Sequence, residues 1–148
     1  MSTTLPPPPP WTTVAGSFEW YVKALKDADD KIKEEHKAFF FAGAVAAHAL
    51  LILDKTATLR TIEELRSWAI DREVIDGGLD DMFRHWQRKK SNRGIPRDLE
   101  LHAFYSGAAT VLSLLNRGGE SGLPGLQREI IQLTLLIDPK KSPKQKAH

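Results

Sequence analysis

One segment of the sequence, residues 82–97, contains basic side chains and no acidic ones. The 148-residue chain has a formal net charge of only +2, so this clustering does not follow from a basic overall composition. Lysine and arginine side chains gathered in one place attract anions such as phosphates or carboxylates. We therefore predict an anion-binding surface loop over residues 84–97. Its binding residues would be the six cations Arg84, Arg88, Lys89, Lys90, Arg93 and Arg97.

Two kinds of anionic partner fit this segment. A nucleic acid would place its phosphates against the cations, and Trp86 could stack on an unpaired base. An acidic protein surface would use the same charges without stacking. A structural explanation also exists, because cations are favoured at helix C-termini and Trp86 continues an apolar stripe. The sequence favours a non-enzymatic binding module, and it leaves nucleic acid and acidic protein surface open as partners.

A second set of residues could act on a phosphodiester. Histidine titrates near neutral pH and can serve as acid or base, while arginine can stabilise a phosphorane. Residues 97–102 begin with Arg97 and end with His102, and this spacing resembles the R-x4-6-H signature of HEPN-domain ribonucleases. In that family a polar residue often follows the arginine, as Asp98 does here, whereas Tyr105 lies one position later than the family's tyrosine. The resemblance covers six residues and implies an alternative function, a metal-independent ribonuclease or toxin with Arg97 and His102 as catalytic residues.

Acidic side chains gather in residues 27–35, which form the counterpart of the basic segment. Such a stretch is usually a solvated helix face. It could also hold a basic partner by imitating the spacing of phosphates. This gives a third possible function, a small partner-blocking inhibitor protein that uses the acidic face 27–35.

Several classes of chemistry are excluded or disfavoured by residue type. The chain has no cysteine, so disulfides, thiol catalysis and thiolate zinc sites are excluded. His48 and His102 lie in two apolar segments, but neither has a second ligand one helical turn away, so we predict no metal site. No Walker A loop and no dinucleotide-binding glycine motif is present, so we also predict no cofactor.

Helices must position these residues, because no segment alternates as a half-buried strand would. Ser17 is a candidate N-cap for a first helix, and residues 61–64 (Thr-Ile-Glu-Glu) read as a capping box for a later one. Pro96 and Pro124 are placed to open further helices, with a stop at Gly118-Gly119 between them. The pattern predicts a compact, single-domain all-α bundle of five or six helices.

Two segments, 38–53 and 99–115, are apolar on all sides and are expected to be the central helices. Residues 40–44 match residues 104–108 in sequence, with Gly43 and Gly107 at the same position. Mid-helix glycine costs about 1 kcal/mol relative to alanine, so we predict that the two helices pack closely at these glycines. An internal duplication and a shared packing demand both explain the likeness.

Around this bundle we expect two terminal segments without fixed structure. The domain organisation predicted is a proline-rich leader (1–16), a helical domain (17–138) and a basic tail (139–148). No signal peptide is readable at the N-terminus. The uncharged run 38–53 is shorter than the roughly 20 residues of a membrane-spanning helix, so we expect no membrane partner and a cytoplasmic protein. The oligomeric state is left open.

Overall fold

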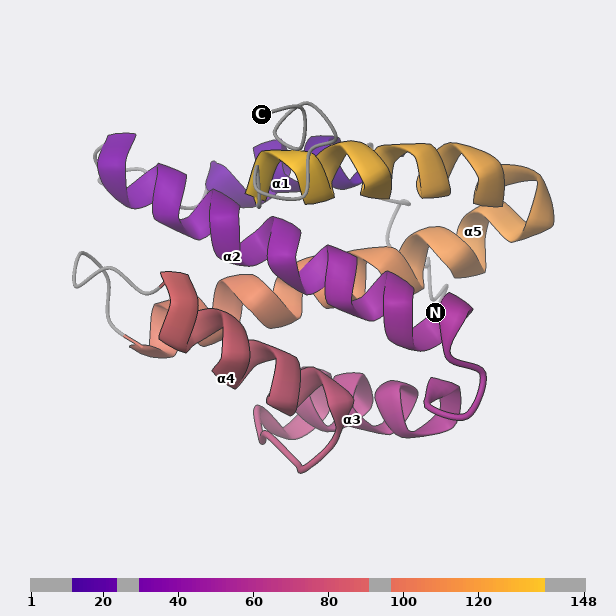
Figure 1. Ribbon diagram of the computed structural model, residues 1–148, viewed down its shortest axis with the longest axis horizontal. Helices are drawn as coiled ribbons and strands as arrows, with labels where there is room; N and C mark the ends of the chain where they lie inside the picture. Colours follow the sequence, from indigo (N-terminus) through magenta and orange to yellow (C-terminus); the bar gives the residue numbers. More distant parts are fainter. Residues whose placement is uncertain (1–11, 24–29, 91–96, 138–148) are drawn as a thin grey trace, which may run out of the picture.

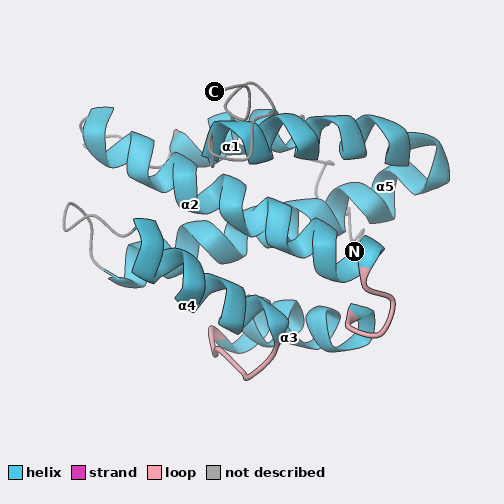
Figure 2. Ribbon diagram, in the orientation of Figure 1, coloured by secondary structure: helices cyan, strands magenta, loops and turns pink. Residues whose placement is uncertain are grey.

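The computed structural model of the protein describes residues 12–23, 30–90 and 97–137. Within these ranges the chain forms helices joined by short loops, without any strand (Figure 2). The elements are α1 (Val14–Val22), α2 (Asp30–His48), a π-helix η1 (Ala49–Leu53) that continues α2, α3 (Thr58–Asp71), α4 (Gly78–Lys90) and α5 (Arg97–Ile137) (Figure 1). The predicted all-α bundle is confirmed.

Helix α5 reverses direction along its length. The hydroxyl of Ser17 in α1 lies 2.9 Å from that of Thr110, while the N–H of Val14 donates to Glu129 at 2.8 Å. Thr110 and Glu129 would be about 28 Å apart in a straight helix, far more than one turn of α1 can bridge. Figure 1 shows the reversal, with the orange part of α5 running one way and the yellow part returning. We call residues 97–117 and 123–137 its N-terminal and C-terminal parts.

The sequence predicted two separate helices in place of α5. The structure instead assigns one continuous helical element that includes Gly118 and has Pro124 inside it. The predicted change of direction is nevertheless present. Proline removes one backbone donor and bends a helix, so Pro124 contributes to the change of direction in this region.

The core is the crossing of α2 with the N-terminal part of α5, as predicted. The two helices run in the same general direction and cross near their middles (Figure 1). A Cβ on Gly43 would overlap the carbonyl of Phe104, and a Cβ on Gly107 would overlap the carbonyl of Phe40. Glycine at both positions is therefore required for the backbones to approach this closely.

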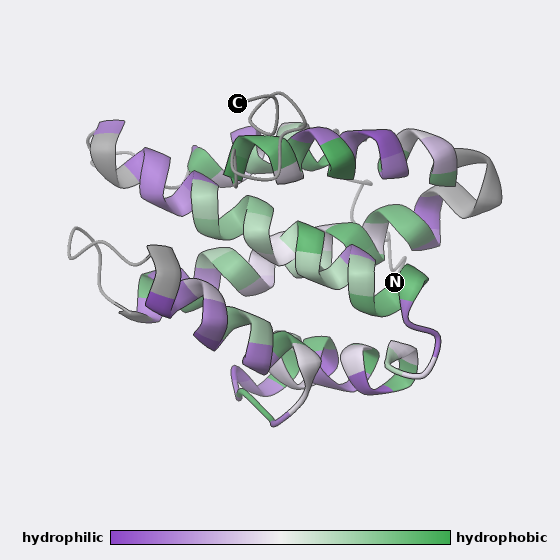
Figure 3. Ribbon diagram, viewed as in Figure 1, coloured by the Kyte–Doolittle hydropathy of each residue, from purple (hydrophilic) through white to green (hydrophobic). Residues whose placement is uncertain are grey.

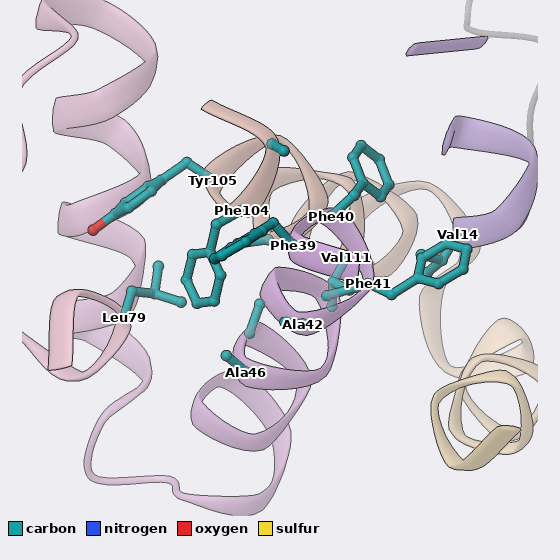
Figure 4. Packing of buried hydrophobic residues seen from close by; sticks show 14 of the residues in the cluster. Val14, Phe39, Phe40, Phe41, Ala42, Ala46, Leu79, Phe104, Tyr105 and Val111 are labelled. Atoms are coloured by element: carbon teal, nitrogen blue, oxygen red, sulfur yellow. The ribbon is translucent and has the colours of Figure 1, made fainter. Parts of the chain in front are cut away.

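Aromatic rings surround the crossing on both sides. Phe39 of α2 and Phe104 of α5 lie together near Leu79 of α4, and Phe41 lies near Val14 of α1 (Figure 4). All five of these side chains are buried. Burying a large apolar side chain contributes roughly 1.5–3 kcal/mol, so this cluster is the main source of stability.

Contacts in the first half of the molecule (α1 to α3) recur in the second half (α4 and α5). Phe18 of α1 packs edge-on against Phe40 of α2, with ring centroids 5.4 Å apart at 62°. Phe83 of α4 packs against Phe104 of α5 in the same way, at 5.3 Å and 64°. The first helix of each half therefore meets the second helix of its own half through equivalent phenylalanines.

The last helical segment of each half caps the first helix of the other half. The carboxylate of Glu64 in α3 accepts hydrogen bonds from the N–H groups of Leu79 (3.2 Å) and Asp80 (3.1 Å) at the start of α4. The carboxylate of Glu129 accepts from Val14 (2.8 Å) and the next residue (3.0 Å) at the start of α1. Reciprocal contacts of this kind relate the halves by an approximate two-fold rotation, which supports the duplication over a shared packing demand.

The predicted capping box at residues 61–64 is wrong. Helix α3 begins at Thr58, one turn earlier, with Ala57 as its N-cap. The hydroxyl of Thr61 donates to the carbonyl of Ala57 at 2.8 Å, as expected for threonine inside a helix. Glu64 cannot reach back to an N-cap from this position, and it caps α4 instead.

The first helix also begins earlier than predicted. Its N-cap is Thr13, whose hydroxyl accepts from the N–H of Gly16 at 2.9 Å, and Ser17 lies in the helix with a buried side chain. Residues 14–16, which the sequence assigned to the leader, form the first turn of α1. The rest of the leader up to residue 11 and the tail from residue 138 lie outside the described residues.

The segment Lys33–Leu53 is long and apolar enough, by length and composition, to cross a membrane. In this fold 67% of it is buried inside the protein, as in the core helix of a soluble protein. Its apolar character is explained by its central position between α4 and the C-terminal part of α5, where Figure 3 shows it in green.

Candidate functional site

Helix α4 positions the described part of the basic segment. Its apolar face buries Phe83 and Trp86, and its opposite face exposes Arg84, His85 and Arg88. Residues 84–90 are thus the last two turns of α4, so the prediction of a surface loop over 84–97 is wrong for this part. Helical periodicity continues because nothing before residue 91 interrupts it.

The cations of this segment differ in their surroundings. Arg84 is paired with the buried carboxylate of Asp80, 2.6 Å away and one turn earlier in α4. Arg88 is exposed and forms no ion pair with any residue that the structure describes. The side chains of Lys89, Lys90 and Arg97 and the whole of residues 91–96, including Arg93, lie outside the described residues. Among the predicted binding residues, Arg88 therefore carries the best-defined free charge.

His102 lies on the N-terminal part of α5 and is half-buried. Its Nδ1 is 3.2 Å from the hydroxyl of Tyr21, and the two rings stack with centroids 5.8 Å apart. Residues 97–102 are helical throughout. The side chain of Arg97 lies outside the described residues, so its pairing with His102 stays a prediction.

A different arginine lies near His102. The ring of Trp68 in α3 is 6.1 Å from the His102 ring, and the guanidinium of Arg72 lies 5.6 Å from the centroid of the same tryptophan. Arg72 is the C-cap of α3 and adopts the left-handed conformation, with φ 53° and ψ 35°. Sequence reasoning missed Tyr21, Trp68 and Arg72 because they come from two segments, α1 and the end of α3, that are distant from residue 102 in the sequence. Glycine or asparagine usually marks such a helix end, and neither stands at this position.

The protonation of this cluster follows from its burial and its charges. Burial lowers the pKa of His102 below the usual 6.5, and the positive charges of Arg72 and His36 lower it further. Burial raises the pKa of Tyr21 to about 12, so this hydroxyl stays protonated. The protonated Tyr21 hydroxyl can donate to Nδ1 of a neutral His102, and in that tautomer the imidazole proton is on Nε2.

A second buried polar group lies between α3 and α4. Burial raises the pKa of Glu64, against the opposing effect of the two backbone N–H groups that it caps. Burial also raises the pKa of Tyr105, whose hydroxyl has no hydrogen-bond partner within the described ranges. Glu64 caps the start of α4, and Asp80 pairs with Arg84. These two carboxylates therefore stabilise the packing of α3 against α4.

The other candidate residues from the sequence are not brought together. No cluster of three or more His, Asp or Glu side chains suited to a metal ion occurs in the part of the chain that the structure describes. His48 is buried on α2, where burial lowers its pKa. Of the acidic face 27–35, residues 27–29 lie outside the described residues. Asp30 and Glu34 are exposed on α2, and Glu35 is partly buried.

An apolar groove follows α2 between α4 and the C-terminal part of α5. One of its hollows, of about 430 Å³, is lined by Val45, Trp86 and Thr134, among others. A second hollow of about 280 Å³ continues it, lined by Ala38, Trp86 and Ile137, among others. The approximate two-fold rotation relates the second hollow to the place that His102 occupies.

No family model, no curated protein and no solved structure matches this chain.

Proposed function

We propose that the protein is a cytoplasmic binding module that engages an anionic partner through the basic end of α4 and its connection to α5. The observation that carries this proposal is Arg88, exposed and without an ion pair to a described residue, on a helix anchored by Phe83 and Trp86. A cation on an anchored helix loses little conformational freedom when it binds, which favours recognition.

The density of charge supports binding over a purely structural role. One or two cations near a helix C-terminus complement its dipole, each contributing about 0.3–1 kcal/mol. The segment has six cations and no acidic residue from 82 to 97, which exceeds that requirement. Arg84 is compensated by Asp80, so binding falls mainly to the cations that follow it.

Binding to nucleic acid is tested by fluorescence anisotropy with labelled single-stranded RNA and duplex DNA across a salt series. The variant Arg88→Gln/Lys89→Gln/Lys90→Gln should weaken binding. It should also reduce the slope of log K against log salt by about 0.7–0.9 per lost phosphate contact. The control Lys55→Gln/Arg66→Gln/Arg128→Gln removes three exposed cations elsewhere and should keep most of the affinity.

Equal losses in the two triple variants would mean that overall charge, and not this segment, drives binding. Absence of binding to both polymers at low salt would reject nucleic acid as the partner. An acidic protein surface would then remain as the partner of the segment.

A further inference from the structure

The approximate two-fold rotation relates the cluster of Tyr21, His102 and Arg72 to a second place in the molecule. Phe18 corresponds to Phe83, so Tyr21 corresponds to Trp86, each three residues later. The same rotation pairs the central helices and the capping glutamates. It therefore makes Ala38 the counterpart of His102 and Ile137 the counterpart of Arg72.

The counterpart residues show what the fold needs at this place. Ala38, Trp86 and Ile137 line one hollow of the apolar groove. These three residues are apolar, and Glu34 and Lys37 of α2 line the same hollow. Tyr21, His102 and Arg72 stand at the equivalent positions of the symmetry-related place, so the polar groups of these three residues are not a requirement of the architecture.

Arg72 is held in a conformation that its backbone does not favour. A non-glycine residue in the left-handed region costs roughly 1–2 kcal/mol. At this helix end the Arg72 N–H donates to the carbonyls of Ser67 and Trp68, and its guanidinium lies 3.5 Å from the carbonyl oxygen of Trp68. Its guanidinium lies over Trp68 and pairs with no carboxylate among residues 12–23, 30–90 and 97–137. Left-handed backbone geometry at an exposed cation close to a half-buried histidine is a feature that functional sites show.

His102 offers a donor next to this cation. In the tautomer in which Tyr21 donates to Nδ1, the proton of the neutral imidazole is on Nε2, for which the structure describes no hydrogen-bond partner. The charged and titratable groups around the ring are Tyr21 from α1, His36 from α2 and Arg72 after α3. None of these three groups is acidic; the acidic residues nearest in the chain are the exposed Asp71 and Glu73, which flank Arg72, and the exposed Asp98, one turn before His102 in α5.

We propose that Arg72 and His102 bind the phosphate group of a small phosphorylated ligand, with Tyr21 as the positioning residue that orients the His102 ring. A guanidinium presents a fork of N–H donors that matches phosphate oxygens, and Nε2–H adds a donor from another direction. Donors from two sides fit a tetrahedral phosphate better than a planar carboxylate. This site is separate from the basic end of α4.

The test is a pH titration of His102 in the full-length protein, followed by NMR of its imidazole Cε1–H signal. The signal is assigned by its loss in His102→Gln. Inorganic phosphate should raise the pKa of His102 by about half a pH unit relative to chloride at equal ionic strength, because a bound anion favours imidazolium. The signal of His48, which lies on the other side of α2, should not move.

Two variants separate the site from general charge effects. Arg72→Gly suits the left-handed backbone and should abolish the phosphate effect on His102, while the protein remains folded. Arg66→Gln removes an exposed cation from α3 and should leave the effect unchanged. If Arg72→Gly does not fold, the wild-type titration still decides, since it needs no variant at Arg72.

Identical His102 titrations in phosphate and chloride would overturn the proposal, as would a phosphate effect that survives in Arg72→Gly. An equal effect of acetate at the same concentration would overturn the assignment to phosphate. The same titration is repeated with glycerol 3-phosphate. A larger rise in the His102 pKa than with inorganic phosphate supports a phosphorylated organic ligand. An equal rise supports free phosphate.

Discussion

Glu64 and Glu129 perform the same task in the two halves of the molecule. Each carboxylate accepts two backbone N–H groups at the start of the first helix of the opposite half. The first N–H groups of a helix have no partner within it, and they carry partial positive charge. The two glutamates therefore tie the halves together by satisfying donors that neither half can satisfy alone.

Replacing these glutamates should destabilise the protein unequally. Glu64→Gln leaves a buried N–H facing an amide NH₂ group and should cost about 1–3 kcal/mol. Glu129→Gln should cost about 1 kcal/mol, since one of its two hydrogen bonds is exposed. Urea denaturation measures both. Glu63→Gln, at an exposed surface pair with Arg60, is the control and should change stability by less than about 1 kcal/mol. A cost for Glu64→Gln no greater than that of this control would contradict the capping role.

The two crossing glycines should tolerate no side chain. Gly43→Ala and Gly107→Ala each place a Cβ against the backbone of the partner helix, which cannot yield as a side-chain tip can. We expect each to cost about 1–3 kcal/mol or more in the free energy of unfolding. Gly125→Ala is the matched control, since nothing lies within 4 Å of its added Cβ. It should stabilise α5 by about 0.5–1 kcal/mol. Wild-type stability of Gly43→Ala would show that the helices can separate at low cost.

Arg72→Gly should not destabilise the protein. Glycine adopts the left-handed conformation readily, which gains roughly 1 kcal/mol. Loss of the cation–π contact with Trp68 reduces this gain in stability by about 0.5 kcal/mol. Thermal unfolding should therefore give a melting temperature equal to or above that of the wild type. A clear decrease would assign Arg72 a structural role.

Stability should fall as the pH is lowered below neutrality. The folded state holds the pKa values of His48 and His102 below the usual 6.5, mainly through burial. At a pH below about 6.5 the unfolded chain binds protons that the folded chain does not, so unfolding is favoured. The stabilisation is complete above that pH and is lost as the pH falls through the folded pKa values. Urea denaturation at pH 7, 6 and 5 measures this.

The double variant His48→Gln/His102→Gln should flatten that dependence. His85→Gln, at an exposed position on α4, should keep the wild-type slope between pH 7 and pH 5. An unchanged slope in the double variant would mean that other groups cause the acid sensitivity.

Much of the fold could be predicted from local pattern. The apolar segments 38–53 and 99–115 predicted the central helices, and Gly43 and Gly107 predicted where they meet. Both inferences depend on composition and helical spacing within one segment, which the chain carries into any tertiary arrangement. Their confirmation shows that burial of a helix is visible in its apolar residues and that close approach of two helices is visible in their glycines.

Predictions of which residue caps which helix were wrong. Glu64 matches the spacing of a capping box for its own helix, yet it caps α4, and Thr13 rather than Ser17 caps α1. Several residues near a helix start can serve as caps. The choice among them is made by which one lies next to free N–H groups after packing.

The sequence by itself determined the helical class, the two central helices and the concentration of basic charge before α5. Each follows from the types and spacing of neighbouring residues. Only the tertiary structure decided that His102 meets Tyr21 and Trp68, with Arg72 beside them, and that the halves cap each other. These contacts join segments that are far apart in the sequence. Backbone geometry around a left-handed Arg72 and a reversed α5 sets them, and no local pattern encodes either.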